Sequence, residues 1–373
     1  MMARPFNFAA GPGMLPETVL ARVREELLDW RGSGMSVLEM PFTGPEFAEI
    51  QADAVERLKR LLAIPVNYRV LFLQGGAYGQ FAFVPLNLLR GRTRAAYVET
   101  GHWSRRAMTE ARRYCSVETV ASGEPDGFTR IPPRDVWRLS PDVAYCHITT
   151  NETAQGVQFH WTPETAAVPL VADMTSDLLS RPIDVARYGL IYASAQKSIG
   201  PAGLTIVIVR DDLLGAALPG TPAVFDYKRQ ADAGSRVNTP PTFAIYVAGL
   251  VFEWLAEQGG LAAMERRNRR NSARLYAAID ASGVYRCPVA PLDRSTTNPC
   301  FRLADESLEA DFLAEARRRG LLNLQGHPAV GGVRVSLYNA MPDAGVDALI
   351  DFMATFARRR GRSRRERGGR SAP

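Results

Sequence analysis

The chain has 373 residues, of which 46% are hydrophobic and 23% are charged, and its formal net charge is +6. This length and composition indicate a folded protein of two domains and exclude a disordered or fibrous chain. Residues 358–373 contain eight arginines and one glutamate, so the rest of the chain carries −1. We therefore expect at most weak, non-specific contacts with nucleic acid from this tail, and no nucleic-acid surface on the folded body.

The cysteine and hydropathy patterns bear on the cellular compartment. The four cysteines form no CxxC or CxxxC pair, and they are Cys115, Cys146, Cys287 and Cys300. This spacing argues against a disulfide scaffold and against a structural zinc site, so we expect no metal. The sequence has no run of about 18 apolar residues, and its start, "MMARPFNFAAGPGMLP", lacks the apolar core of a signal peptide. We expect a cytoplasmic protein without a membrane segment.

Short apolar runs alternate with amphipathic stretches over the first two thirds of the chain. In chain order, the runs typical of strands are residues 69–73, 95–98, 143–148, 170–172, 190–193 and 204–209. The stretches typical of helices between several of them are residues 46–62, 78–89 and 104–114. Strands that alternate with helices predict an α/β fold, with a mostly parallel sheet flanked by helices on both faces.

The pattern changes after Pro240 and Pro241. Two helices follow, at residues 242–257 and 261–282, and the remainder indicates a smaller α+β unit. We divide the chain into four parts on this basis. These are an N-terminal segment that packs with the small domain (1–16), a large domain (17–257), a small C-terminal domain (258–357) and a disordered arginine-rich tail (358–373).

Lys197 lies in "YASAQKSIG", directly after an apolar run. The chain contains only three lysines, so 42 of its 45 basic residues are arginine. A lysine amine can form a Schiff base with a carbonyl compound, and a guanidinium cannot. The small residues on both sides of Lys197 would let a bulky planar group approach the backbone. The alternative is an ordinary surface lysine in a turn, and the lysine alone does not decide between the two.

Asp173 ends another apolar run, in "PLVADMTSD". A carboxylate in such a place is costly unless it has a partner. Enzymes that use pyridoxal phosphate need an acid opposite the pyridine nitrogen of the cofactor. An aspartate at one strand end and a lysine at a later strand end match that requirement. A helix-capping role would explain Asp173 alone but not the pair.

Three further segments fit the same cofactor. "QGGAYGQF" follows a strand and opens a helix, so the backbone N–H groups after its two glycines could bind a phosphate. Trp103, after another strand, could stack on a pyridine ring, and Thr153, in "NET", could bind the ring hydroxyl. Each of these residues is, taken alone, more often structural.

Together these segments resemble the phosphoserine aminotransferase family. The resemblance covers residues 4–357 and rests on "FNFAAGP", "NET", "LSRPIDVARYG", "YGLIYASAQKSIGPAGLTIVIV", "NTPPTF" and "GGVRVSLYNAMP", which occur in the order of the family. It implies the type I fold of enzymes that use pyridoxal 5'-phosphate. It also implies a homodimer with active sites shared between subunits, and amino acids and 2-oxo acids as substrates. The implied reaction is amino transfer between L-glutamate and 3-phosphohydroxypyruvate, a step of serine biosynthesis.

The resemblance also implies roles for individual residues. Lys197 would bind the cofactor and move the proton, and Asp173 would pair with the pyridine nitrogen. The other implied cofactor contacts are Gly76, Ala77, Trp103, Thr153 and Gln196, with Asn238 and Thr239 supplied by the partner subunit. The implied substrate contact is Arg334, for the α-carboxylate. We also expect His327 and Thr43 to contact the substrate, although Thr43 is not the residue that the family usually has at its position.

The chain departs from the family pattern in the region that binds the distal anion of the substrate. Basic residues that the family usually has there are replaced by Phe42, Thr43, Tyr78 and Pro328. One hypothesis is that other arginines compensate, the candidates being Arg105, Arg106 and Arg236. The other is a divergent aminotransferase for a non-phosphorylated amino or keto acid.

Two hypotheses from other functional classes also stand at this point. A lyase of the same fold would need a nucleophilic cysteine, for which Cys300 is the candidate. An RNA-binding module would depend on the arginine tail alone.

Overall fold

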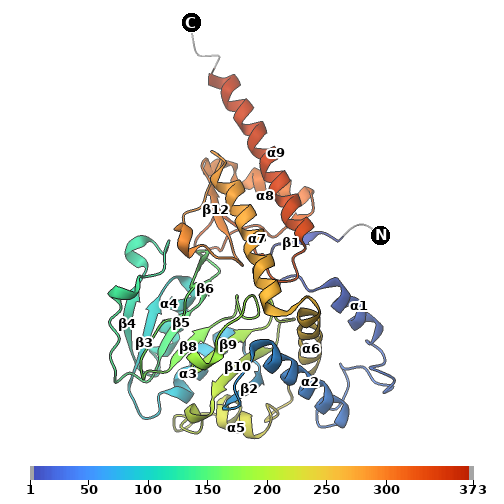
Figure 1. Cartoon of the computed structure of the whole chain (residues 1–373), viewed down its shortest axis with the longest axis vertical. Helices are drawn as coiled ribbons and strands as arrows, with labels where there is room; N and C mark the ends of the chain where they lie inside the picture. Colours follow the sequence, from blue (N-terminus) through green and yellow to red (C-terminus); the bar gives the residue numbers. More distant parts are fainter. Residues whose placement is uncertain (1–3, 369–373) are drawn as a thin grey trace.

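Across residues 4–368, which the computed structural model describes, a seven-stranded sheet forms the centre of the larger part of the molecule (Figure 1). In spatial order its strands are β2 (Tyr68–Leu73), β10 (Thr205–Arg210), β9 (Leu190–Ser194), β8 (Leu170–Asp173), β5 (Cys146–Thr149), β3 (Arg94–Glu99) and β4 (Ser116–Ser122). Strand β10 is antiparallel to both of its neighbours, and the other pairs are parallel. The predicted mostly parallel α/β sheet is confirmed.

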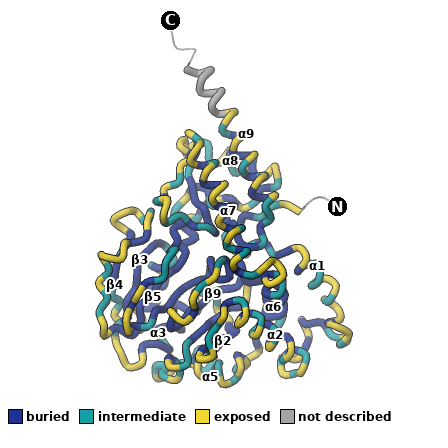
Figure 2. Tube along the Cα trace, viewed as in Figure 1, coloured by how far each residue is buried: buried dark blue, intermediate teal, exposed yellow. Residues whose placement is uncertain are grey.

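Helices cover both faces of this sheet. Successive strand residues point to opposite faces, so Val171 packs with helices α3 (Gly76–Leu88) and α4 (His102–Ala111), whereas Ala172 packs with the opposite layer. That layer contains α1 (Glu17–Glu25), α2 (Pro45–Leu62) and α6 (Thr242–Glu257), with α5 (Tyr227–Asp232) at the sheet edge. In α2 the buried apolar residues recur at helical spacing, and they are Phe47, Ile50, Ala54 and Leu58. Figure 2 shows this layering as a buried sheet within partly exposed helices.

A smaller unit lies above the sheet in Figure 1. Its strands are β11 (Tyr285–Arg286), β12 (Cys300–Leu303) and β14 (Val333–Arg334), and its helices are α8 (Glu309–Arg318) and α9 (Asp343–Gly368). Helix α7 (Gly260–Asp280) connects the two units, because Leu261 packs in the core of the larger unit and Leu275 in that of the smaller one. The two cores therefore share one helix.

Short strand pairs complete the fold. Strand β1 (Phe6–Asn7) runs parallel to β13 (Leu321–Leu322), and Phe8 is buried in the core of the smaller unit. Strands β6 (Asn151–Glu152) and β7 (Val157–Gln158) form a hairpin directly after β5. This hairpin carries residues of the candidate site.

The C-terminal region differs from the expectation in part. We expected disorder from Arg358 onward, but α9 continues as a helix to Gly368, and residues 369–373 lie outside the described part of the chain. Once a helix is nucleated, each added residue gains a backbone hydrogen bond, and arginine is a good helix former.

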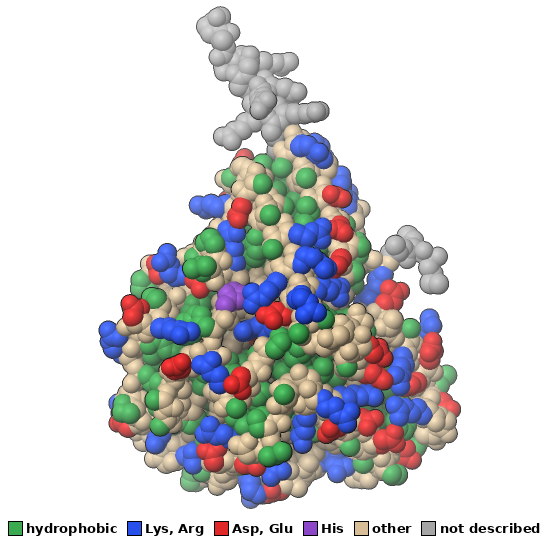
Figure 3. Space-filling view, in the orientation of Figure 1, with side chains coloured by type: hydrophobic (Ala, Val, Ile, Leu, Met, Phe, Trp, Pro, Cys, Tyr) green, Lys and Arg blue, Asp and Glu red, His purple; other side chains and the backbone are tan. Residues whose placement is uncertain are grey.

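Within residues 4–368, the search for a helix long and apolar enough to span a membrane found none. Basic and acidic side chains are interspersed over the face shown in Figure 3.

Candidate active site

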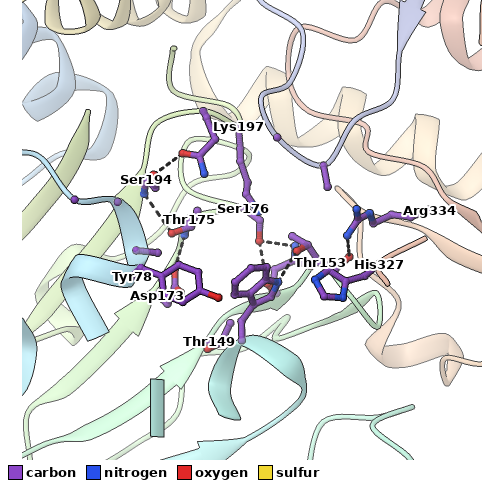
Figure 4. Close-up of a pocket in the computed structure, with 18 residues that line it drawn as sticks. Tyr78, Thr149, Thr153, Asp173, Thr175, Ser176, Ser194, Lys197, His327 and Arg334 are labelled. Carbon is purple, nitrogen blue, oxygen red and sulfur yellow. Dashed lines mark hydrogen bonds between the residues drawn. The ribbon is translucent and has the colours of Figure 1, made fainter. Parts of the chain in front are cut away.

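A pocket of about 300 Å³ opens at the carboxyl ends of β5, β8 and β9. It is lined by nine of the residues predicted from the sequence: Gly76, Ala77, Trp103, Thr153, Asp173, Gln196, Lys197, His327 and Arg334. In Figure 4, Lys197 extends into the pocket between Asp173 and Tyr78 on one side and Arg334 and His327 on the other. The pocket therefore lies between the two units of the fold.

Asp173 and Lys197 are both buried in this pocket, with 5% and 8% of their surface exposed. The Oδ1 atom of Asp173 accepts a hydrogen bond of 2.9 Å from the N–H of Thr175. Burial raises the pKa of Asp173, and the hydrogen bonds from Thr175 and the nearby Lys197 oppose that shift. Burial lowers the pKa of Lys197 to about 8, although the carboxylate of Asp173 opposes this. The Lys197 amine is thus neutral in a larger fraction of molecules than an exposed lysine would be.

The turn before α3 forms an anion site. Gly75 and Gly76 have φ values of +96° and +64°, in the left-handed region that favours glycine. The N–H of Gly76 donates to Oγ1 of Thr205 at 2.8 Å, so this group, which we expected in the phosphate site, is already engaged. Within the described residues, the N–H groups of Ala77 and Tyr78 have no acceptor. These two donors at the helix start are the ones available to a phosphate.

Trp103 is held from two directions. Its backbone N–H donates to Oε2 of Glu152 at 2.9 Å, and its ring Nε1 donates to Oγ1 of Thr153 at 2.8 Å. Glu152 is fully buried and also accepts the N–H of Ser104 at 2.8 Å. Our sequence analysis did not assign a role to Glu152, although it lies within the "NET" segment. Its role depends on contacts with a helix some 50 positions earlier in the chain, which no local pattern reveals.

Arg334 and His327 approach the pocket from the smaller unit. The Nη1 atom of Arg334 donates to the backbone oxygen of Thr153 at 3.2 Å, and no carboxylate among the described residues pairs with this guanidinium. The Nδ1 atom of His327 accepts the N–H of Ala329 at 3.2 Å. Arg334 therefore retains donors for a substrate carboxylate.

Three predicted residues lie outside the pocket of the single chain. Thr43, Asn238 and Thr239 are exposed, and the Nδ2 atom of Asn238 donates to Oε1 of Gln74 at 3.0 Å. They belong to the segments that the resemblance assigns to the site of a partner subunit. Arg236 is also outside the pocket and lines a separate depression beside α2.

The sequence analysis missed several small polar residues of the pocket. Thr149 ends β5, and its Oγ1 is buried without a hydrogen-bond partner in the described part of the chain. Ser194 ends β9, and its hydroxyl donates to Oε1 of Gln196, which leaves the Nε2 of Gln196 for other contacts. Both residues could have been found from their position at the carboxyl end of a strand of the parallel sheet, where ligands bind in such folds.

These groups fit pyridoxal 5'-phosphate. The pocket combines a buried amine, a buried carboxylate, an anion site at a helix start and the hydroxyl of Thr149, which has no hydrogen-bond partner among the residues that the structure describes. They match the aldehyde, the ring nitrogen, the phosphate and the polar ring substituents of that cofactor.

The lyase hypothesis receives no support from the geometry. Cys300 is buried, and burial raises the pKa of its thiol to about 12. A thiol in that state is a poor nucleophile near neutral pH.

Comparisons with known proteins identify relatives over nearly the full length of the chain. The family model of class-V aminotransferases matches residues 5–349. A phosphoserine aminotransferase of Laribacter hongkongensis is 58% identical over 357 residues, which cover 95% of this chain and 99% of that protein. A solved phosphoserine aminotransferase of Bacillus circulans subsp. alkalophilus is 42% identical with a TM-score of 0.94, over 96% of this chain and 99% of that one. A PLP-bound phosphoserine aminotransferase of Trichomonas vaginalis is 40% identical with a TM-score of 0.91, over 94% and 100%.

Proposed function

The chain belongs to the phosphoserine aminotransferase family of class-V aminotransferases, and on that premise we propose how its own residues carry out the reaction. The protein is an aminotransferase with the type I fold, and its cofactor is pyridoxal 5'-phosphate. The reaction is reversible amino transfer between L-glutamate and 3-phosphohydroxypyruvate, which yields O-phospho-L-serine for serine biosynthesis. The alternative of a divergent specificity for non-phosphorylated acids is overturned by near full-length relatives of 58% and 54% identity that bear this name.

Lys197 would hold the cofactor at its aldehyde, and Asp173 would hold it at its ring nitrogen. When bound, the cofactor withdraws electrons from the substrate Cα. Asp173 would accept a hydrogen bond from the protonated ring nitrogen, which favours the carboxylate form of this buried group. Lys197 Nζ would bind the cofactor covalently and, once the substrate amine has displaced it, would take the proton from Cα and return it. The lowered pKa of Lys197 suits this base, because a neutral amine is needed.

Other residues would orient the cofactor and the substrate. The N–H groups of Ala77 and Tyr78 and the amide of Gln196 would bind the cofactor phosphate. Trp103, fixed by Glu152 and Thr153, would cover one face of the ring. Arg334 would hold the substrate α-carboxylate with two parallel hydrogen bonds. This contact would exclude orientations of the bound substrate in which its Cα points away from Lys197.

We further propose a homodimer in which each pocket receives residues from the partner. Asn238, Thr239 and Thr43 are exposed on the single chain, as a contribution to a second subunit requires. Leu28 and Leu38, 84% and 63% exposed, lie on the segment that leads to Thr43 and would be covered in such a dimer. We also propose a cytoplasmic location, which the free cysteines support.

The observation that carries the functional proposal is the joint burial of Lys197 and Asp173 in one pocket with the anion site of α3. The test is a half-reaction. The purified holoenzyme is mixed with O-phospho-L-serine or with L-glutamate, and the absorbance of the cofactor is followed as it accepts the amino group. Fast conversion by both amino acids is expected. Conversion by neutral amino acids alone would contradict the proposed substrates.

A further inference from the structure

Three side chains with positive or hydrogen-donating groups gather at the side of the pocket where α4 begins. His102 and His327 have ring centroids 4.4 Å apart, and His327 also lies 5.8 Å from the Trp103 ring. Arg106 is four residues after His102 on α4, so the two side chains project from the same face of that helix. The cluster of His102, Arg106 and His327 therefore extends from the wall of the pocket, at His327, to the protein surface, at Arg106.

The arginines of α4 differ in whether their charge is already neutralised. Arg105 donates to Oε1 of Glu99 at 2.6 Å and also pairs with Glu124. Arg106 is exposed and has no carboxylate partner within the described residues. Burial lowers the pKa of both imidazoles of the cluster; the charge of Arg106 lowers the pKa of His102 further, and it adds to the larger effects of His102 and Arg334 on the pKa of His327. The charge of Arg106 is therefore available to an anion, whereas that of Arg105 is not.

The imidazole of His327 also offers a donor. Its Nδ1 accepts the N–H of Ala329, so the ring proton of the neutral form lies on Nε2. His327 lines the pocket that contains Lys197 and Arg334. An anion that enters beside Arg334 would thus also meet the neutral N–H donor of His327.

We propose that His102, Arg106 and His327 bind the distal phosphate of the substrate. This inference rests on the proposed function, and it identifies the groups that replace the basic residues absent at Tyr78 and Pro328. A phosphate dianion is stabilised by an unpaired guanidinium and by N–H donors, and Arg106 with the two imidazoles supplies both. Neither Tyr78 nor Pro328 carries a charge, so the positive charge that the cluster supplies to this wall of the pocket is that of Arg106.

The test compares substitutions on one helix in the holoenzyme. Arg106→Gln and His102→Asn are expected to raise the KM for O-phospho-L-serine about tenfold or more, the size of a lost charge-assisted hydrogen bond, with kcat nearly unchanged. The half-reaction with a neutral amino acid such as L-alanine should not change. Arg106→Lys keeps the charge and should lose less than Arg106→Gln.

Direct binding of inorganic phosphate provides a second readout. Calorimetric titration of the holoenzyme should give a Kd that is about tenfold higher in Arg106→Gln than in the unmodified protein. Arg105→Gln is the matched control. It removes a charge from the same helix, but Glu99 and Glu124 already neutralise that charge. The Kd of Arg105→Gln for phosphate should stay within about twofold of that of the unmodified protein.

The outcomes separate this inference from the proposed function. If phosphate affinity and the KM for O-phospho-L-serine are unchanged in both Arg106→Gln and His102→Asn, the inference is wrong while the function stands. Equal weakening by Arg105→Gln, or weakening only by Arg236→Gln, would also overturn it. If the unmodified enzyme converts only neutral amino acids, the proposed function fails, and the phosphate titration still reports whether the cluster binds an anion.

Discussion

The backbone N–H of Trp103 donates a 2.9 Å hydrogen bond to Oε2 of Glu152, a carboxylate with no exposed surface. Together with the bond from the Ser104 N–H, this contact satisfies the second and third donors of α4, and Gln155 accepts the first, from the His102 N–H. Because the α4 helix start carries partial positive charge, an acidic group is favoured there. Burial nevertheless raises the pKa of Glu152 to about 7, against the effect of these donors. Glu152 therefore positions the Trp103 ring at the edge of the pocket.

Glu152→Gln should destabilise the fold around α4. The carboxamide has one oxygen in place of two, so its NH₂ group would face a backbone N–H that has no other acceptor. A buried donor without a partner costs about 1–3 kcal/mol, and we expect a fall of that size in the free energy of unfolding. Thermal and urea unfolding measure it, and near-UV circular dichroism reports the displaced tryptophan.

The control for this change is Glu110→Gln on the same helix. Glu110 pairs with Arg113 at the surface, where such pairs contribute about 0–1 kcal/mol. If the free energy of unfolding falls no more in Glu152→Gln than in Glu110→Gln, the buried contact with Trp103 does not stabilise α4.

Lys197→Met should severely slow amino transfer. Without a base at the substrate Cα, we expect the half-reaction to slow by about 10²–10⁴-fold, and the cofactor to be held only non-covalently. Borohydride reduction followed by mass spectrometry distinguishes the covalent from the non-covalent complex. Lys228→Met is the matched control, since Lys228 is exposed and pairs with Asp232. Equal activity of the two variants would refute the role of Lys197.

The pKa of Lys197 predicts a pH dependence for cofactor uptake. Its value of about 8 means that the amine is mostly charged below pH 8 and mostly neutral above it. Because only the neutral amine attacks an aldehyde, the rate at which the apoenzyme takes up the cofactor should rise with pH and level off above about 8. Stopped-flow absorbance from pH 6.5 to 9.5 measures this rate. A rate independent of pH over that range would contradict the lowered pKa.

Asp173→Asn should move that pH profile. The carboxylate of Asp173 favours the charged form of Lys197 and so raises its pKa, in opposition to burial. Its removal should therefore shift the midpoint of cofactor uptake to lower pH and also weaken the retention of the cofactor. An unchanged midpoint would mean that the two groups do not interact in the apoenzyme.

The proposed dimer predicts complementation between inactive variants. A pocket in a mixed dimer can combine Lys197 of one chain with Asn238 and Thr239 of the other. After subunit exchange, an equal mixture of Lys197→Met and the double variant Asn238→Ala, Thr239→Ala should regain roughly a quarter of full activity, because half of the dimers are mixed and have one intact site. Failure to regain activity, with exchange verified by mass spectrometry, would place these residues outside the partner's site.

Local sequence features determined the fold class and the two central residues of the site. Apolar runs that alternate with amphipathic stretches predicted the strands β2, β3, β8, β9 and β10 and the helices α2, α3, α4, α6 and α7. The run at residues 143–148 also predicted β5, although the strand is displaced toward the C-terminus and spans Cys146–Thr149. Lys197 was singled out because lysine is scarce in this chain and its amine can form a Schiff base, and Asp173 because a carboxylate at the end of an apolar run is costly unless it has a partner. These signals lie within a few residues of one another, so they can be read from the chain alone. Strand β4 was missed, because this edge strand is exposed in part and lacks a continuous apolar run.

The tertiary structure decided which side chains act together. Arg105 and Arg106 are adjacent and chemically equal in the sequence, yet only the fold brings Glu99 and Glu124 to Arg105 and leaves Arg106 without a carboxylate partner among residues 4–368. The contact of Glu152 with Trp103 and the proximity of His102 to His327 join residues separated by 49 and 225 positions. Hydrogen bonds and charge neutralisation depend on distances of a few ångströms, and a local pattern holds no information on such distances between remote segments.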